Sequence, residues 1–358
     1  MNMCKAFAEN GNDVYLIVPN RRVPELKSEN DFAFYGIKPC FQIERIAVPA
    51  VKGQSLLYGF KAALRTARLK PDIVYGRNVI GCSIASFLGI PTTFESHSPI
   101  MESGFVSRVL FATMIRSRNF KRLVVISDAL RRHYSEHYHS ISDTVVAHDG
   151  ADPPYQKMSQ ECTHASGKLQ VGYIGSLYKG RGLDLIISLA QKCPWCDFHV
   201  IGGSNVDLQK GELKDHIDNL TFHGQLPPRS VEIFRANFDI LLAPYQREIA
   251  THAGNNTVQW MSPLKIFEYM SAGKAIVCSN LPVLHEILKQ GETVVFCDPD
   301  KVEDWHKALV TLRDDRELRQ RLGANAQAEF LAKYTWGKRA ESVLHYSNVD
   351  DLTEATIK

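Results

Sequence analysis

The sequence lacks the features of membrane-spanning and secreted proteins. None of its apolar runs approaches the roughly 20 residues that cross a bilayer, and its first residues lack the apolar core of a signal peptide. The eight cysteines are scattered rather than spaced as a disulfide framework. These absences argue against integral-membrane and disulfide-stapled classes, and they predict a cytoplasmic protein with reduced thiols.

The sequence also lacks a large net charge of either sign. The 358 residues carry a formal net charge of +3, with 44% hydrophobic and 23% charged residues, which is ordinary for a globular protein. We expect no nucleic-acid partner. The charge is uneven, with 19 Lys and Arg against 13 Asp and Glu up to residue 150, and 23 against 26 beyond it. The length predicts two domains.

Apolar runs alternate with helix-like segments in both halves of the chain, which predicts two doubly wound, Rossmann-like parallel sheets. In the second half the expected strands are Val171–Ile174, Phe198–Ile201, Leu220–Phe222, Ile240–Ala243, Ala275–Cys278 and Val294–Phe296. The expected helices there are Leu183–Ala190, Val206–Ile217, Ser230–Ala236, Pro263–Ala272 and Val283–Leu288, with further helices over Val302–Tyr334.

The first half repeats the alternation less regularly. Its expected strands are Val14–Val18, Ile73–Tyr75, Thr92–Phe94, Leu123–Ile126 and Thr144–Ala147, and its expected helices are Gln54–Leu69, Ile80–Leu88, Val106–Met114 and Ala129–His137. The chain starts in an amphipathic helix, Met3–Glu9, so we expect this domain to lack its first strand, through about 15–25 missing upstream residues or through loss of the strand. We place the domains at 1–152 and 153–335, with a linker from Asp152 to Gly167.

A glycine-rich, basic loop follows the first strand of the second half and precedes a helix. It reads Gly175-Ser-Leu-Tyr-Lys-Gly-Arg-Gly182. Glycines allow close backbone approach to a ligand, and a helix N-terminus offers free N–H groups to an anion. With Lys179 and Arg181 at its mouth, the loop containing Gly175 and Ser176 favours a diphosphate over the alternative of a flexible basic turn.

The segment SPLKIFEYM, residues 262–270, predicts a second anion site. Ser262 is a suitable N-cap and Pro263 a suitable first helical residue, which would place Leu264 and Lys265 in the first turn. Glu268 could accept hydrogen bonds from ribose hydroxyls, or it could form a solvated ion pair with Lys265. Tyr245 opens the long polar loop that leads to this helix, and we include it among the candidate donor-binding residues.

A third candidate lies in the first half, at the carboxyl end of a strand. The run Thr92-Thr-Phe-Glu-Ser-His-Ser-Pro99 places Glu95 and His97 where ligands bind in such folds. A histidine is more often structural, but a position in a cleft makes His97 a candidate ligand contact.

Together, several segments resemble the retaining, nucleotide-sugar-dependent glycosyltransferases of family 4, which have the GT-B fold. The resemblance runs from Met3 to about Tyr346, and it is carried by MCKAFAENGNDVYLIVP, FESHSP, VVISDALRRHY, VVAHDGAD, VGYIGSLYKGRGLDLII, SPLKIFEYMSAGKAIVCSNLPVLHEIL and ANAQAEFLAKYTWGKRAE. It implies two domains facing a cleft, with a final helix from Trp336 returning to the first domain.

The resemblance also implies roles for single residues. Arg181 is similar to the family's basic residue on the donor diphosphate, Glu268 to its ribose glutamate, and His97 to its cleft histidine near the transferred sugar. Two positions depart from the pattern: Trp260 stands where a second glutamate often contacts the donor sugar, and Ser176 where an arginine is frequent. These departures put the contacts to the sugar in doubt.

The implied reaction moves a sugar from a nucleoside diphosphate to a glycan or lipid-linked acceptor, with retention and without a metal or other cofactor. Lys179, Arg181 and helix dipoles would stabilise the departing diphosphate, and we find no carboxylate pair for a double displacement. Such enzymes serve cell-surface polysaccharide or glycolipid synthesis. A nucleotide-sugar epimerase of similar architecture and an inactive nucleotide-sugar-binding protein are the alternatives.

Residues 105–122 mix large apolar side chains with five basic residues. This composition fits a core helix with a basic face, and it also fits an interfacial helix that docks on the inner face of a membrane. Two other motifs are set aside. Cys193-Pro-Trp-Cys196 follows a helix instead of opening one, so redox chemistry is not favoured, and Asp298-Pro-Asp300 is simpler as a turn than as a metal site.

Overall fold

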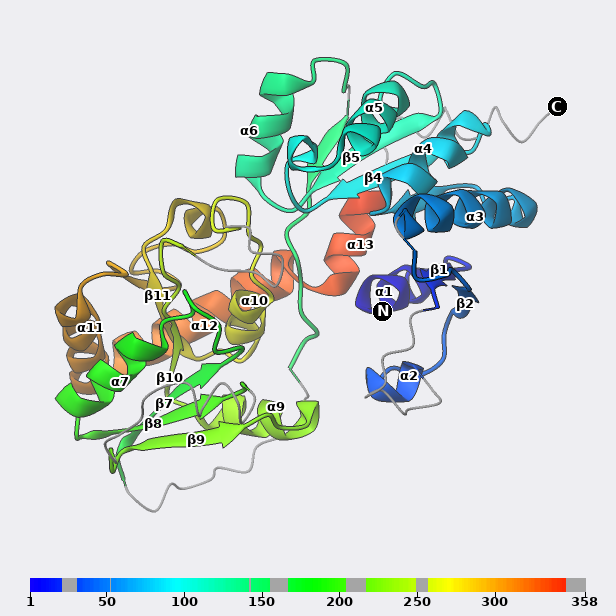
Figure 1. Cartoon of the computed structure of the whole chain (residues 1–358). Helices are drawn as coiled ribbons and strands as arrows, with labels where there is room; N and C mark the ends of the chain where they lie inside the picture. The colour runs from blue at the N-terminus through cyan, green and yellow to red at the C-terminus, as the bar shows by residue number, and fades with distance from the viewer. Residues whose placement is uncertain are drawn as a thin grey trace. The chain divides into compact units, whose positions relative to one another are not determined.

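The computed structural model describes residues 1–20, 31–51, 53–141, 143–154, 167–203, 217–248 and 257–345. The chain divides into two compact units (Figure 1). Unit 1 comprises Met1–His148 and Trp336–Lys358, and unit 2 comprises Asp149–Thr335. The expected division lay four residues later, between residues 152 and 153, with the same return of the chain at Trp336.

Unit 2 is built on one parallel sheet of six strands in the order β12-β11-β10-β7-β8-β9. The strands are β7 (Leu169–Ile174), β8 (Cys196–Ile201), β9 (Leu220–Gly224), β10 (Ile240–Ala243), β11 (Ala275–Ser279) and β12 (Val295–Cys297). The chain runs outward from β7 to β9 and then returns to the other side of β7 at β10. The strand order therefore reverses between β7 and β10, which is where doubly wound sheets bind ligands.

Helices cover both faces of this sheet. They are α7 (Leu183–Lys192), α9 (Pro228–Asn237), α10 (Leu264–Ser271), α11 (Val302–Asp314) and α12 (Arg316–Lys333), with the short 3-10 helix η2 (Pro282–Glu286). Alternate residues of β10 enter different cores: Leu241 and Ala243 pack with α10 and α12, whereas Ile240 and Leu242 pack with α7 and α11. Burial on both faces explains the continuous apolar strands and confirms the predicted fold class.

Two helices were expected in unit 2 at segments where the structure describes no α-helix. The segment expected at Val206–Ile217 lies outside the described residues except for its last one. The α-helix expected at Val283–Leu288 was wrong, because the chain forms η2 there. The Ile287 N–H donates to Leu284 O at 3.2 Å, the spacing of a 3-10 turn, and the five-residue segment begins with Pro282.

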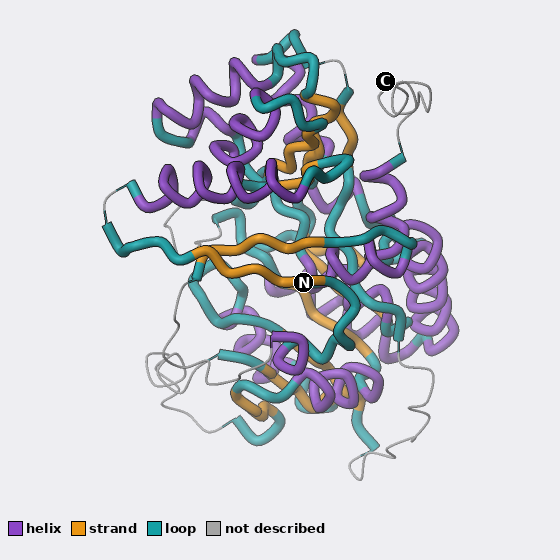
Figure 2. Tube along the Cα trace, turned by 90° about the vertical axis from the view of Figure 1, so that its right-hand side faces the viewer, coloured by secondary structure: helices purple, strands orange, loops and turns teal. Residues whose placement is uncertain are grey.

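Unit 1 contains two parallel sheets. Four strands pair in the order β3-β4-β5-β6 and two pair as β1-β2, a pair that lies beside the N-terminus in Figure 2. The strands are β1 (Tyr15–Pro19), β2 (Gln42–Ile46), β3 (Val74–Gly76), β4 (Thr92–Ser96), β5 (Phe120–Val125) and β6 (Thr144–Val146). Strand β2 was missed because its sequence, QIERI, is only half-buried and lacks an apolar run.

The helices of unit 1 are α1 (Asn2–Glu9), α2 (Asp31–Phe34), α3 (Gln54–Leu69), α4 (Val79–Phe87), η1 (Ile100–Glu102), α5 (Phe105–Met114), α6 (Asp128–His137) and α13 (Trp336–Leu344). Helix α13 packs on α1, where Phe7 joins Ala340 and Val343 in one buried cluster. That this domain lacks its first strand stays a prediction.

The segment 105–122 divides its side chains between core and surface. Phe111 and Met114 are fully buried, whereas Phe105 is 71% exposed and Val106 and Val109 are also exposed. Of its basic residues, Arg122 is buried and contacts Asp143 at 2.7 Å, so it belongs to the fold and not to a basic surface. None of the helices described in the structure is both long and apolar enough to span a bilayer.

Candidate functional site

The carboxyl ends of β7 and β10 carry two loops that are fastened together. The Gln246 N–H after β10 donates to the Gly180 carbonyl after β7 at 2.9 Å. Gly182 has φ +80°, and a Cβ there would lie 2.1 Å from the Pro244 carbonyl oxygen, so only glycine permits this approach. The basic loop is therefore held against the start of the loop that contains Tyr245.

The backbone at Gly175 and Ser176 lies against Lys265 of α10. A Cβ on Gly175 would stand 2.7 Å from Lys265 Nζ, and the Tyr173 hydroxyl donates to the Ser176 carbonyl at 2.7 Å. Strand β7 thus ends in a turn whose shape depends on glycine and on a buried tyrosine. The structure therefore brings together Gly175, Ser176 and Lys265, three residues of the predicted donor site.

Two cations lie over aromatic rings at this point. Lys265 Nζ is 3.7 Å from the centroid of the Tyr173 ring and 5.4 Å from that of Tyr245, and the Arg181 guanidinium is 5.6 Å from Tyr245. Burial and the neighbouring Arg181 hold the pKa of Lys265 well below its usual range. The Arg181 Nε is buried with no hydrogen-bond partner among the described residues. This arrangement is typical of a site that receives an anion.

The start of α10 differs in detail from the prediction. Pro263 is the N-cap and the helix begins at Leu264. Ser262 does not cap the helix, because its hydroxyl accepts a hydrogen bond from the Asp149 N–H at 2.7 Å. Tyr269 fastens α10 to the end of β7, since its hydroxyl accepts from the Ile174 N–H at 2.8 Å. The first turn of α10, which carries Lys265, lies against Gly175 at the start of the basic loop.

Within the described residues, Glu268 does not form the ion pair with Lys265 that was weighed from the sequence, and its contact with a ribose stays a prediction. Its carboxylate lies 3.5 Å from the guanidinium of Arg235 at the end of α9, a side chain that is mostly buried. Sequence reasoning missed Arg235, because it stands in an ordinary amphipathic helix before β10. The Arg235 Nε has no partner among the described residues either.

The structure gives fewer contacts for the other residues predicted to bind the donor. Lys179 lies at the exposed tip of the basic loop, and the structure describes no hydrogen bond or ion pair for it. Leu264 is half-exposed at the start of α10. Residues 249–256 of the long loop lie outside the described residues. Lys179 is near the site in sequence, and its contact with a diphosphate stays a prediction.

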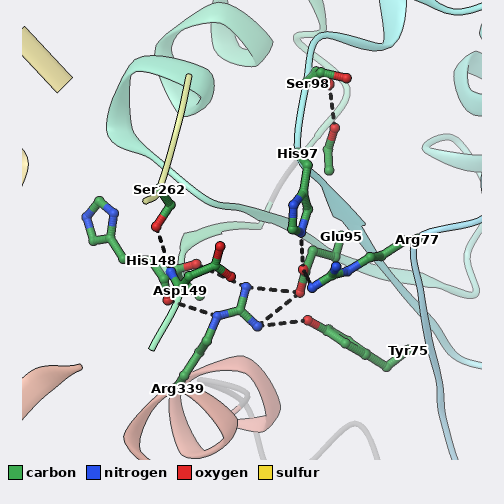
Figure 3. A network of polar contacts seen from close by, with 11 residues as sticks. Tyr75, Arg77, Glu95, His97, Ser98, His148, Asp149, Ser262 and Arg339 are labelled. Carbon is green, nitrogen blue, oxygen red and sulfur yellow. Dashed lines mark hydrogen bonds and ion pairs between the residues drawn. The ribbon is translucent and has the colours of Figure 1, made fainter. Parts of the chain in front are cut away.

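Unit 1 presents a different kind of site, at the carboxyl ends of β3 and β4. Glu95 of β4 has a side chain with no exposed surface, and three side chains contact it (Figure 3). His97 Nε2 lies 2.5 Å and Arg77 Nη2 2.7 Å from Glu95 Oε1, and Arg339 Nη2 lies 3.1 Å from Glu95 Oε2. The sequence indicated Glu95 and His97 but not the two arginines.

Arg339 comes from α13, almost 250 residues further along the chain. Besides Glu95, it donates from Nε to the His148 carbonyl at 2.8 Å, from Nη2 to the Ala147 carbonyl at 3.2 Å and from Nη1 to the Tyr75 hydroxyl at 3.3 Å. Such long-range pairing has no local signature in a sequence, although a basic residue on the buried face of a terminal helix could have suggested it.

Comparison with known families decides which fold family this geometry represents. Residues 1–154 match Glycosyltransferase Family 4 and residues 155–329 match Glycosyl transferases group 1. The chain belongs to the family 4 (group 1) glycosyltransferases of the GT-B fold. The resemblance inferred from the motifs is confirmed.

Individual relatives are distant. Sulfoquinovosyl transferase SQD2 of Arabidopsis thaliana is 22% identical over 376 residues, covering 94% of this chain and 66% of its own length. The structure of sucrose-phosphate synthase from Thermosynechococcus elongatus aligns with TM-score 0.68 and 13% identity over 94% of this chain and 89% of its own. Anabaena HepE in complex with UDP and glucose aligns with TM-score 0.67 and 14% identity, covering 96% and 92%.

The motifs set aside from the sequence can also be located. The thiols of Cys193 and Cys196 are buried, and burial raises the pKa of Cys193 to about 11, so neither is a ready thiolate. Asp298 accepts from the Asp300 N–H at 3.1 Å, the geometry of the expected turn. Within the described ranges no group of three or more His, Cys, Asp or Glu side chains is placed to hold a metal, and the metal-free reaction stays a prediction.

Proposed function

We propose that the protein transfers a sugar, with retention, from a nucleoside-diphosphate sugar to a glycan or lipid-linked acceptor. One observation carries the proposal: Arg181, Arg235 and Lys265 meet at the switch point of the unit 2 sheet with Glu268 as the neighbouring carboxylate. An excess of partly buried cations is unfavourable until an anion arrives. A diphosphate group supplies that anion.

Each part of the donor then has a partner. Arg181, Lys265 and the N–H groups at the start of α10 would bind the diphosphate, with the backbone of Gly175 and Ser176 alongside. Glu268 would accept hydrogen bonds from the ribose. The HepE structures bind UDP and UDP-glucose, which supports uracil as the first base to test.

The same cations would carry the chemistry. As the bond between sugar and phosphate breaks, negative charge grows on the departing diphosphate, and pre-placed guanidinium and ammonium groups stabilise it without a metal. The acceptor hydroxyl attacks from the face of departure, which retains the configuration. His97 of unit 1 would contact a substrate hydroxyl.

The donor assignment is tested by thermal unfolding with UDP, GDP or ADP, each without metal. A nucleotide at about 100 times its dissociation constant adds roughly 2.7 kcal/mol, or about 5–10 °C in a domain of this size. We expect a shift with one nucleotide and its loss in Glu268→Ala and Arg181→Ala variants. The absence of a shift with all three would contradict the proposal.

Product analysis separates the alternatives. NMR spectra of the anomeric proton in the product distinguish retention from inversion. An epimerase would convert the nucleotide sugar without any acceptor, and an inactive binding protein would show the thermal shift without turnover. Transfer to a sugar or lipid-linked acceptor with unchanged anomeric configuration is the outcome that supports the proposal.

We further infer that the protein binds its acceptor at the anionic inner surface of a membrane. Exposed Met101, Phe105, Val106 and Val109 lie on η1 and α5, and Arg108 is exposed on the same helix. Apolar side chains flanked by arginine suit an interface that contains anionic lipid.

Flotation with vesicles tests this contact. We expect binding to phosphatidylglycerol-containing vesicles, weaker binding to pure phosphatidylcholine, and a loss of binding in the Phe105→Ser/Val109→Ser variant. Phe87→Ser is the matched control, because Phe87 is 52% exposed on another helix of the same unit. Equal flotation of both variants would contradict the assignment to α5.

A further inference from the structure

Glu95 is an unusual residue to find buried in a central strand. Strand β4 is buried along its whole length, and Phe94 points to the side of the sheet where it packs near the Phe111 ring of α5. Side chains alternate along a strand, so Glu95 points to the opposite side. There it meets Arg339, whose side chain is 2% exposed. A buried carboxylate is costly unless it is paired, and here the pairing is extensive.

The contacts to Glu95 divide between its two oxygens. Oε2 accepts from the buried Arg339, at 3.1 and 3.2 Å to its two terminal nitrogens. Oε1 accepts from Arg77 and from His97 Nε2. One oxygen therefore anchors the carboxylate to the interior, and the other faces two more exposed side chains, Arg77 at 54% and His97 at 34% exposure.

The imidazole of His97 consequently has a defined orientation. A carboxylate can only accept hydrogen bonds, so His97 Nε2 carries the proton of this contact. In the neutral ring the other nitrogen, Nδ1, is then an acceptor. The structure describes no hydrogen bond to Nδ1 from the residues that it covers; in Figure 3 the contact of the ring runs from Nε2 to Glu95, and the His97 side chain is 34% exposed.

The backbone that carries His97 is fastened as well. The Ser96 hydroxyl lies 2.8 Å from the Tyr134 hydroxyl, which also accepts from the Ile100 N–H at 3.0 Å. The loop is thus held on both sides of His97. The position of the imidazole is set by its backbone, and its proton by Glu95.

We propose that Glu95 is a positioning residue that fixes His97 as the Nε2–H tautomer and presents Nδ1 to accept a hydrogen bond from a sugar hydroxyl, with Arg339 of α13 holding Glu95 in place. The proposal rests on the glycosyltransferase function proposed above. It gives α13 a task besides packing, because the arginine that anchors the carboxylate comes from this helix.

Glu95→Gln is the informative substitution. The amide must keep its oxygen toward Arg339, because that guanidinium is buried and cannot move, whereas the exposed Arg77 can turn away. The amide NH₂ then faces His97 and donates to Nε2, which moves the imidazole proton to Nδ1. Glu102→Gln is the control, since Glu102 is exposed on η1 of the same unit.

The first readout is the tautomer itself. NMR of ¹⁵N-histidine-labelled protein, with His97 assigned by its loss in His97→Gln, reports which nitrogen is protonated in the neutral ring. We expect Nε2–H in the wild type and in Glu102→Gln, and Nδ1–H in Glu95→Gln. Nδ1–H in the wild type would overturn the proposal, even if Glu95→Gln did not fold.

The second readout is kinetic. We expect Glu95→Gln to lower kcat at least about tenfold, while the dissociation constant of UDP measured on the same protein stays within about twofold. An unchanged kcat with a changed tautomer would overturn the role in catalysis. If the wild type did not bind UDP, that result would count against the donor site. Failure of the donor-site proposal is thus distinguishable from failure of the role proposed for Glu95.

The rate of donor hydrolysis in the absence of acceptor shows whether the sugar hydroxyl belongs to the donor or to the acceptor. If Nδ1 accepts from a hydroxyl of the donor sugar, Glu95→Gln slows hydrolysis and transfer by similar factors. If it accepts from the acceptor, only transfer slows. A variant that slows neither reaction contradicts both assignments.

Discussion

The two sites of this protein treat buried charge in opposite ways. In unit 1 the Glu95 carboxylate is contacted by three side chains, and Arg339 donates to four groups. In unit 2 the Nε atoms of Arg181 and Arg235 are buried without a partner among the described residues. A saturated cluster holds a side chain in place, whereas an unsaturated one is prepared for a ligand.

The difference has an energetic consequence. Paired, hydrogen-bonded charges support the fold, and breaking such a pair costs several kcal/mol. Buried N–H groups of cations that lack an acceptor lower stability until an anion binds, and the binding energy offsets that cost. Substitutions that break the pairing in unit 1 should therefore lower stability, and substitutions of the cations in unit 2 should lower ligand affinity.

The largest effect is expected from removing the carboxylate of unit 1. Glu95→Ala leaves the guanidinium of Arg339 buried without its counter-ion, and we expect the free energy of unfolding to fall by about 3–5 kcal/mol. Urea unfolding monitored by circular dichroism measures this change.

The matched control is an exposed pair in the same unit. Glu44 contacts Arg65 at 2.7 Å with both side chains more than a third exposed, so Glu44→Ala should cost at most about 1 kcal/mol. Equal losses for the two variants would show that burial does not distinguish the pairs, and the comparison between the sites would fail.

In unit 2, removing a charged side chain of the site should not lower the stability of the unliganded protein. Arg181→Gln removes a cation whose Nε is buried without a described partner, so the unliganded protein should be as stable as the wild type or more stable. Its affinity for the nucleoside diphosphate should fall about 10- to 100-fold, since a charge-assisted hydrogen bond contributes about 1.5–3 kcal/mol. Calorimetric titration measures the affinity, and thermal unfolding without ligand measures the stability. A large loss of stability with unchanged affinity would mean that Arg181 is part of the fold.

Much of unit 2 was accessible from its sequence. Its strands are apolar runs because the sheet is covered on both faces, and Gly175 and Gly182 mark places where the backbone approaches another element. The helix expected at Pro263–Ala272 likewise ends just before Gly273, whose φ is +66°. Local chemistry sets these features, so local patterns predict them.

The partners of the site residues were not accessible in the same way. Arg339 meets Glu95 only because α13 returns to unit 1, and Arg235 meets Glu268 only because α9 and α10 pack near each other. Ser262 looked like a helix cap, but its hydroxyl is used by the distant Asp149 N–H. Pairings across long sequence separations depend on tertiary packing, which a single sequence does not display.

A third prediction concerns protons taken up with the nucleotide. Burial and Arg181 lower the pKa of Lys265, while Glu268 and Cys278 act in the opposite direction and the rings of Tyr173 and Tyr245 lie beside it. An arriving diphosphate adds negative charge and raises this pKa again. Binding should therefore take up a proton at a pH between the two values.

The sign of the pH dependence follows. Affinity should fall as pH rises above the lowered pKa of the free protein, by up to about tenfold per pH unit. Calorimetric titrations in two buffers of different ionisation enthalpy measure the proton uptake. Lys265→Met should abolish it, and Lys192→Met, at an exposed lysine paired with Glu303, should not. Buffer-independent enthalpies in the wild type would refute the coupling.

The smallest effect is expected at Arg235, and it asks whether unit 2 contains any positioning of the kind seen in unit 1. Arg235 lies 3.5 Å from Glu268, a longer contact than those to Glu95, and the carboxylate is 40% exposed. If Arg235 orients Glu268 toward the ribose, Arg235→Gln should weaken UDP binding about three- to tenfold and leave 2′-deoxy-UDP and 3′-deoxy-UDP binding less affected.

The double variant separates orientation from direct contact. If Arg235 acts through Glu268, Arg235→Gln should add little to the loss already caused by Glu268→Gln, because the two residues then form one unit. Additive losses, with UDP and its deoxy analogues weakened equally, would place Arg235 on the diphosphate instead. In that case unit 2 would hold three phosphate-binding cations and leave Glu268 without a fixed orientation. The contrast with Glu95 would then be sharper, since the carboxylate of unit 1 is positioned by its partners before any substrate binds.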